Sequence, residues 1–198
     1  MIPLIPFYDL SYANQIVAAA QRRRVAVIAN VDSGPSNRVD LVWKRFLVAL
    51  AQSKAEIFGY VPLRRYIGNK GSPSTQAQVY SDVKLWGDLY GVKRFFFDDY
   101  GKVHPVLPAA AISVANAGVP MSSVCGTTVI WETVGYTASK PFATQKSAVI
   151  AMGERNFSSA MELARKRGVA YFYAVSAGDT WAAYDKLPRY FDAMIDEA

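Results

Sequence analysis

Eight short runs of apolar, β-forming residues recur along the 198-residue chain. Most are continuously apolar instead of alternating, as expected for strands that are buried on both faces of a parallel sheet. The runs cover residues 4–8, 25–30, 56–61, 94–99, 120–125, 128–133, 147–152 and 169–175. Their number and their continuous apolar character constrain the fold more than any other feature of the sequence.

Segments with the periodicity of amphipathic helices fill many of the gaps between these runs. In the clearest one, Asp40–Ser53, apolar residues recur near helical spacing and Asp40 is the predicted N-cap. The other predicted helices are Tyr12–Arg23, Ser74–Tyr90, Pro108–Ala117, Asn156–Lys166 and Tyr184–Glu197. Three glycines follow such segments at positions typical of helix C-termini, namely Gly91, Gly118 and Gly168.

Alternating strands and helices are typical of a parallel sheet covered by helices. Eight such units predict an α/β fold of the (β/α)8 TIM-like type. The chain is at the lower end of the lengths of such barrels, about 200 residues, so we expect a compact barrel with some short or missing helices. Residues 1–198 are expected to form this single domain. The alternative is an open, doubly wound sheet.

The net charge and the low counts of cysteine and histidine exclude several classes of function. The net charge is +6, but the basic residues are scattered and no recognition motif accompanies them, so we expect no specific nucleic-acid partner. The single cysteine, Cys125, precludes an intrachain disulfide, and with one histidine there is no Cys/His cluster for a metal. We expect no metal and no cofactor. The segment 68–73 (GNKGSP) is predicted to be a flexible loop without a phosphate-binding pattern.

The apolar runs also bear on where the protein works. None approaches the ~20 residues of a membrane span. The N-terminal MIPLIPFYDL lacks the basic segment and the cleavage site of a signal peptide. The sequence therefore predicts no membrane span, no signal peptide and synthesis in the cytoplasm. Release from the cell or assembly into a larger particle is compatible with these features.

Acidic residues lie where several predicted strands end. Asp98 and Asp99 follow three phenylalanines, and Glu132 follows the apolar run Val129–Trp131. In a parallel barrel, functional side chains gather at the carboxyl ends of the strands. Successive strand residues point to opposite faces, so a regular strand can direct only one of the two aspartates into the barrel mouth.

Hydrolysis of a glycosidic bond requires at least two carboxyl groups, which a barrel can present across its mouth. One protonates the leaving oxygen, while the other is a nucleophile or activates water. We assign Asp98 as nucleophile or substrate-orienting group, Glu132 as general acid/base and Asp99 as the supporting or alternative acid. In the alternative interpretation, one aspartate caps the helix or turn that follows.

Aromatic and polar residues near other strand ends are candidate sugar contacts. Aromatic rings can stack on sugar rings, and amide and carboxylate groups can bind hydroxyls. The candidate substrate-binding residues are Tyr8, Asn30, Tyr60, Trp131, Asp179 and Trp181. Packing within the core is the alternative role for the aromatic members of this set.

Five motifs, taken in chain order, resemble those of the spherulin-4-like proteins. They are IANVDSGPS (28–36), FGYVPLRRYIG (58–68), GVKRFFFDDY (91–100), VIWET (129–133) and YDKLPRYFDAMI (184–195). The resemblance implies a (β/α)8 barrel and glycoside hydrolase activity on amino-sugar-containing polysaccharides, such as galactosamine-rich exopolymers. It also implies that Asp98 and Asp99 match the family's Asp-Glu pair, and that Glu132 matches its later glutamate.

The chain departs from the family pattern around the predicted cleft. Asp99 is one methylene shorter than the family glutamate, and Val31 and Ser36 replace a proline and a glycine of the loop after the second strand. Arg64 stands near an expected Tyr-Gly turn, and residues 124–126 (Val-Cys-Gly) replace an expected Asn-Pro-Gly. These changes bear on the substrate. A net positive charge suits an anionic envelope polymer better than a cationic, deacetylated one.

The sequence thus predicts a glycoside hydrolase that cleaves a cell-surface or extracellular polysaccharide. The alternative is a barrel with weak or no catalysis that binds carbohydrate or serves as a structural component, for example of a virion. A cleft filled by Arg64 or Arg65 would favour this alternative. An open acidic groove lined by Tyr60 and Trp131 would favour the enzyme.

Overall fold

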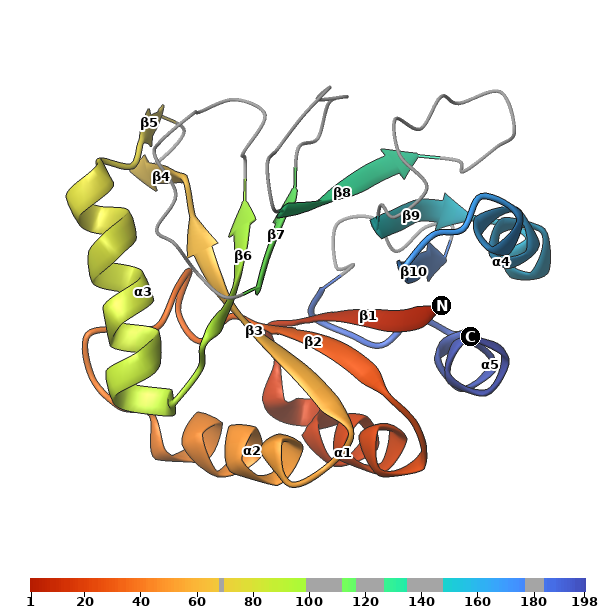
Figure 1. The fold of residues 1–198 in the computed structure, drawn as a ribbon, viewed down its shortest axis with the longest axis horizontal. Helices are drawn as coiled ribbons and strands as arrows, with labels where there is room; N and C mark the ends of the chain where they lie inside the picture. Colours follow the sequence, from red (N-terminus) through yellow and green to blue (C-terminus); the bar gives the residue numbers. More distant parts are fainter. Residues whose placement is uncertain (68–69, 99–111, 117–126, 135–147, 177–183) are drawn as a thin grey trace.

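The computed structural model describes residues 1–67, 70–98, 112–116, 127–134, 148–176 and 184–198 (Figure 1). These ranges form a mixed α/β fold. Eight strands belong to one sheet: β1 (Ile2–Phe7), β2 (Val25–Ala29), β3 (Ala55–Pro62), β6 (Arg94–Asp98), β7 (Ile112–Asn116), β8 (Thr127–Val134), β9 (Ala148–Glu154) and β10 (Tyr171–Ser176). The helices are α1 (Ala13–Arg22), α2 (Leu41–Ala51), α3 (Gln76–Tyr90), α4 (Phe157–Lys166) and α5 (Phe191–Glu197), with a short 3-10 helix at Leu10–Tyr12.

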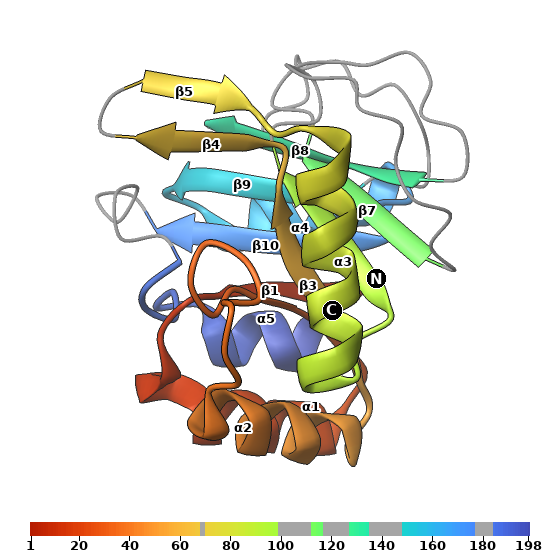
Figure 2. The same cartoon turned by 90° about the vertical axis from the view of Figure 1, so that its left-hand side faces the viewer.

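The eight strands pair in parallel in the order β1-β10-β9-β8-β7-β6-β3-β2, and β2 pairs again with β1, so the hydrogen-bonded order is a closed ring. A separate antiparallel hairpin, β4 (Arg64–Ile67) and β5 (Lys70–Pro73), follows β3. The helices lie outside the strands (Figures 1 and 2). The predicted α/β class with a parallel sheet is confirmed. Within the described ranges, no helix is long and apolar enough to cross a membrane.

The structure corrects three local predictions. The predicted helix Pro108–Ala117 is wrong at Ile112–Asn116, which forms β7 and pairs with β6 and β8, and the rest of that prediction lies outside the described residues. Hydrogen bonding to two neighbouring strands outweighs the helix propensity of the segment, which is a weak preference. The predicted loop at 68–73 is also wrong in part, because Lys70–Pro73 is β5. The last helix begins at Phe191, not at Tyr184, since Pro188 disfavours helical geometry at the residue before it.

Other predictions are confirmed or lie outside the described residues. The Asp40 side chain caps α2 by accepting from the backbone N–H groups of Val42 and Trp43 at 2.8 and 3.0 Å. Gly91 and Gly168 follow α3 and α4 with φ of 72° and 65°, the left-handed geometry that suits glycine. The predicted strand at 120–125 lies outside the described residues, and so does Gly118.

Helix α3 fixes the outer face of β3. A Cβ atom on Gly59 would lie 2.5 Å from the ring of Trp86, so the two elements approach as closely as only glycine allows. The Trp86 indole N–H donates to the backbone oxygen of Tyr60 at 2.8 Å. Packing and a hydrogen bond therefore set the position of the carboxyl end of β3.

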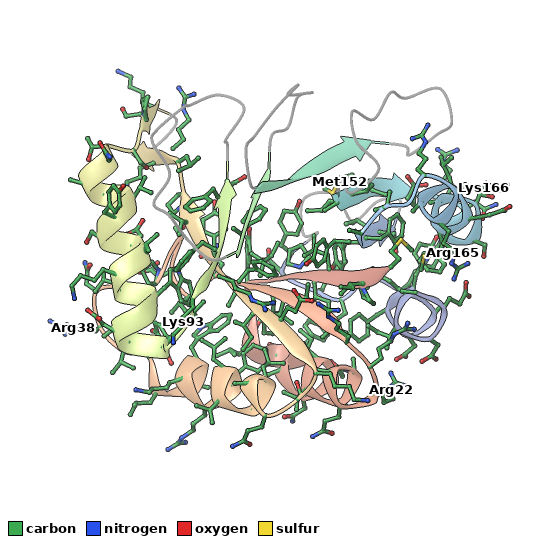
Figure 3. The ribbon with its side chains drawn as sticks, viewed as in Figure 1. Arg22, Arg38, Lys93, Met152, Arg165 and Lys166 are labelled. Carbon is green, nitrogen blue, oxygen red and sulfur yellow. The ribbon has the colours of Figure 1, made fainter. Side chains whose placement is uncertain are left out.

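The opposite face of β3 lies inside the ring. Glu56 and Phe58 reach across the ring to Tyr171 of β10, while Tyr60, on the same face of β3, contacts Asp98 of the neighbouring strand β6. Charged side chains such as Arg22, Lys93 and Lys166 lie around the outside of the molecule (Figure 3). A few polar side chains lie inside the ring instead, among them Glu56, Tyr60 and Asp98.

Candidate active site at the carboxyl ends of the strands

A small cavity of about 40 Å³ lies inside the ring at the carboxyl ends of the strands. It is lined by Pro6, Tyr8, Ile28, Phe96, Asp98, Ile150 and Tyr184. Four strands and the segment that leads to α5 supply these side chains. The cavity is large enough for water and lies at the end of the strands where the sequence predicted the site.

Asp98 supplies the carboxylate of this cavity. It is the last residue of β6, and its Oδ2 accepts a hydrogen bond from the Tyr60 hydroxyl at 2.7 Å. Phe96, two residues earlier, also lines the cavity, whereas Phe95 and Phe97 contact each other with ring centroids 6.3 Å apart. The alternation of the strand therefore directs Asp98 inward, while the predicted catalytic candidate Asp99 lies outside the described residues.

Three tyrosines form an aromatic wall beside Asp98. The Tyr8 ring lies between those of Tyr60 and Tyr184, with centroid distances of 5.8 and 5.3 Å. Tyr60 also packs on Phe96 at 5.8 Å. Two of these, Tyr8 and Tyr60, were predicted as substrate contacts. Tyr184 was missed as a site residue, although it opens the last of the five motifs that resemble the spherulin-4-like proteins.

Asn30 has a role in shaping the loop that follows β2. The side chain is 9% exposed, and its Oδ1 accepts from the backbone N–H of Gly34 at 2.9 Å. The backbone N–H of Asn30 donates to the backbone oxygen of Phe7 at 3.1 Å. Asn30 thus connects the loop to the end of β1, and its predicted contact with sugar stays a prediction.

For two other predicted site residues, Glu132 and Trp131, the structure gives the position of the backbone in the sheet. Glu132 lies on β8 in register with Ile150 of β9, and Trp131 with Val149. Since Ile150 lines the cavity, the backbone of Glu132 is adjacent to a cavity-lining position. The predicted substrate contacts Asp179 and Trp181 lie outside the described residues.

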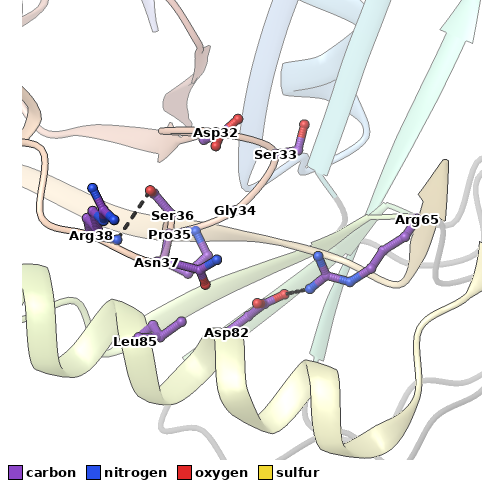
Figure 4. A pocket seen from close by; sticks show the side chains of 10 residues that line it. All are labelled: Asp32, Ser33, Gly34, Pro35, Ser36, Asn37, Arg38, Arg65, Asp82 and Leu85. Carbon is purple, nitrogen blue, oxygen red and sulfur yellow. Dashed lines mark hydrogen bonds and ion pairs between the residues drawn. The ribbon is translucent and has the colours of Figure 1, made fainter. Parts of the chain in front are cut away.

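A larger polar pocket of about 330 Å³ lies between the loop after β2 and helix α3 (Figure 4). We call it the loop pocket, and it is lined by Asp32, Ser33, Gly34, Pro35, Ser36, Asn37, Arg38, Arg65, Asp82 and Leu85. Arg65 pairs with the mostly buried Asp82 at 2.5 Å. Burial raises the pKa of Asp82 above its ordinary value, while the Arg65 charge opposes this rise. Sequence analysis noted Val31 and Ser36 of this loop as departures from the family pattern but did not predict the pocket.

A different polar cluster closes the amino end of the ring. Glu56, near the start of β3, is 7% exposed and accepts from Arg24 at 2.5 Å, from Arg94 at 2.7 Å and from the Tyr171 hydroxyl at 3.1 Å. Burial, and then the negative charge of Glu56, raise the pKa of Tyr171. Sequence analysis did not single out this cluster, because its members are far apart along the chain.

Comparison with protein-family models, with curated proteins and with solved structures finds no match for this chain. Among the residues that the structure describes, no group of three or more His, Cys, Asp or Glu side chains is placed to hold a metal ion. The candidate function is therefore argued from the cavity and its carboxylate.

Proposed function

We propose that the protein is a glycoside hydrolase that cleaves a cell-surface or extracellular polysaccharide. One observation carries the proposal. The Asp98 carboxylate accepts from the Tyr60 hydroxyl at 2.7 Å and lines a cavity walled by aromatic rings at the carboxyl ends of parallel strands. Glycoside hydrolases place Asp and Glu carboxyl groups at the bond that is cleaved, and Asp98 is proposed as one member of such a pair.

The proposal includes a compact (β/α)8 barrel with some short or missing helices. Helices follow β1, β2, β9 and β10, and α3 follows β3 after the hairpin. The register supports it as well. From β1 round to β10, the residue offsets of the seven successive pairings total 161, whereas β1 pairs directly with β10 at an offset of 169. The difference of eight equals the shear of (β/α)8 barrels.

The proposed roles of the carboxylates follow from their surroundings. The hydrogen bond from Tyr60 fixes the Asp98 carboxylate at the cavity, which suits Asp98 as nucleophile or as the group that orients the substrate. Glu132 is then the proposed general acid, which protonates the leaving oxygen and afterwards activates water as a base. Its register beside Ile150 supports this role, since Ile150 lines the cavity.

The positions of two arginines support an enzyme over a module that only binds. The Arg64 guanidinium donates to the Gly71 oxygen at 3.1 Å within the hairpin, and Arg65 pairs with Asp82 of α3. Neither residue is among those that line the cavity at Asp98. An arginine within that cavity was the feature expected of a binding or structural component.

The proposed substrate rests on two features. The resemblance to the spherulin-4-like proteins supports an amino-sugar-containing polymer. The net charge of +6 supports an anionic envelope glycan, because opposite charge attracts the polymer to the protein surface. Both classes therefore belong in the assay.

The test is release of reducing ends from a panel of galactosamine-rich polymers and anionic envelope glycans. Wild type is compared with Glu132→Gln, and Glu162→Gln on the exposed side of α4 is the matched control. We expect Glu132→Gln to lower the rate by about 10²–10⁴-fold, the range for loss of a general acid. Equal rates for wild type and Glu132→Gln would remove Glu132 from the mechanism, and no release from any polymer would count against the hydrolase.

A further inference from the structure

The loop pocket has balanced charges. Two arginines, Arg38 and Arg65, and two aspartates, Asp32 and Asp82, line it, and one pair of opposite charges already forms an ion pair. A pocket without a net charge gives little electrostatic preference for an ionic ligand. Serine hydroxyls and an asparagine amide add groups that both donate and accept hydrogen bonds. This mixture matches a ligand whose own groups both donate and accept, as sugar hydroxyls do.

One donor in the pocket wall has no partner among the described residues. The Arg65 Nε atom is buried and makes no hydrogen bond, although the same guanidinium donates to Asp82 through Nη2. A buried donor without an acceptor is costly to a fold. Figure 4 shows the guanidinium directed toward Asp82 and the loop.

The loop is held in a defined shape. Ser33 and Ser36 have φ of 49° and 63°, in the left-handed region that residues other than glycine rarely adopt. Hydrogen bonds from Gly34 to Asn30, and from Val31 and Asp32 to the Gly34 oxygen, maintain this geometry. Strained backbone that surrounding contacts enforce is common at ligand sites. The pocket is thus largely preformed.

Size and position suggest what the ligand is. A volume of about 330 Å³ is at the lower end of the range for small-molecule sites, so the pocket suits a single compact unit. Pro35 and Leu85 offer apolar surface for the carbon-bound hydrogens of a ring. Asn30 links the pocket loop to the end of β1, next to the candidate active site. A ligand in the pocket can therefore belong to the polymer that reaches Asp98.

We infer that the loop pocket is a subsite for an uncharged sugar unit of the polysaccharide, separate from the unit that is cleaved. The inference rests on the proposed function for the identity of the polymer. In the free protein the pocket is preformed, and its serine, asparagine and arginine side chains offer hydrogen bonds to a bound sugar. Binding here increases affinity for long chains and favours uncharged over charged units.

The test measures binding to polysaccharide with cleavage suppressed. Asp98→Asn is the background, and its migration is followed in native gels that contain N-acetylated galactosamine polymer, its deacetylated cationic form or an anionic phosphate-bearing glycan. Asn37→Ala with Arg38→Ala removes two exposed pocket side chains. Asn14→Ala with Arg45→Ala removes the same two residue types from exposed sites on α1 and α2. Thermal unfolding confirms that both double variants fold.

We expect the pocket double variant to bind the uncharged polymer about tenfold more weakly, since it loses two hydrogen-bonding groups, while the matched control is unchanged. Equal binding by the two double variants would overturn the inference. So would pocket-dependent binding of the charged polymers alone, or no binding of any polymer. Pocket-dependent binding without hydrolysis of the panel by wild type would sink the proposed hydrolase and leave the subsite standing.

Discussion

The two ends of the strand ring each present a carboxylate, and their surroundings differ. At the amino end, Glu56 contacts the guanidinium groups of Arg24 and Arg94. At the carboxyl end, Asp98 accepts from the hydroxyl of Tyr60 and borders a cavity. The same two strands supply both ends, since Glu56 and Tyr60 lie on β3, and Arg94 and Asp98 lie on β6.

This difference in surroundings indicates that the amino end stabilises the fold and that the carboxyl end has the functional role. A buried carboxylate between two guanidinium groups is already compensated, and removal of one partner leaves uncompensated charge. A carboxylate that borders a cavity can contact a ligand there. The amino end of a barrel usually carries stability and the carboxyl end carries function. The predictions below sharpen or break this division.

The largest effect on stability is expected at the amino end. Glu56→Ala removes the buried acceptor that Arg24, Arg94 and Tyr171 share, and we expect the loss of these hydrogen bonds to lower the free energy of unfolding by about 3 kcal/mol. Urea unfolding measures the change, with Glu162→Ala on the surface of α4 as the control. A loss no larger than that of the control would show that the cluster does not stabilise the ring.

The next effect is expected where α3 meets β3. In Gly59→Ala, the new Cβ atom lies 2.5 Å from the Trp86 ring in the present geometry, so α3 must shift. We expect a loss of about 1–3 kcal/mol, the usual cost of overpacking, measured by urea unfolding. Gly87→Ala in α3 is the control, because its Cβ atom would meet only an atom at 4.0 Å. Equal stability of the two variants would refute the close packing.

A smaller, functional effect is expected at Tyr60. Tyr60→Phe removes the hydroxyl that donates to Asp98 while the ring can keep its contacts with Tyr8 and Phe96. We expect hydrolysis to fall about tenfold and stability by about 1 kcal/mol, the net value of one hydrogen bond. Tyr80→Phe on the exposed face of α3 is the control. Undiminished hydrolysis by Tyr60→Phe would mean that Asp98 does not need this donor.

The smallest effect is expected at alkaline pH. The pKa of Tyr171 is raised in the folded protein by burial and by Glu56, so folding favours the protonated phenol. This contribution is complete below pH ~10, the unfolded pKa, and is lost as the pH rises through the folded pKa. As the pH rises through this window, the free energy of unfolding should therefore fall more steeply for wild type than for Tyr171→Phe. Urea unfolding at a series of pH values measures both curves. Parallel curves would contradict a raised pKa of Tyr171 in the folded protein.

Local patterns in the sequence predicted much of the sheet and one end of the ring. Phe95–Phe97 followed by Asp98 is a buried strand that ends in a polar group, and this pattern can be recognised without a structure. The hydrogen bond between Tyr60 and Asp98 depends on the register between β3 and β6, which no local pattern specifies. The β7 segment Ile112–Asn116 was predicted as part of a helix because residues 108–117 include five alanines, which favour helices, and because the strand's pairing partners are remote.

The missed features share the same cause. Glu56, Arg94 and Tyr171 meet only after β3, β6 and β10 have closed into a ring, so nothing near each residue indicates the cluster. Arg65 and the loop after β2 form a pocket because α3 places Asp82 between them. Tertiary arrangement, not local propensity, creates these sites.

The most direct test compares Asp98→Asn with Glu56→Gln in two measurements, reducing-end release per folded molecule and urea unfolding. We predict that Asp98→Asn loses hydrolysis by at least about a hundredfold and keeps its stability within about 1 kcal/mol. We predict the reverse for Glu56→Gln, which should lose stability and keep its activity. Full activity of Asp98→Asn, or equal loss of activity in both variants, would contradict the division between the two ends of the ring.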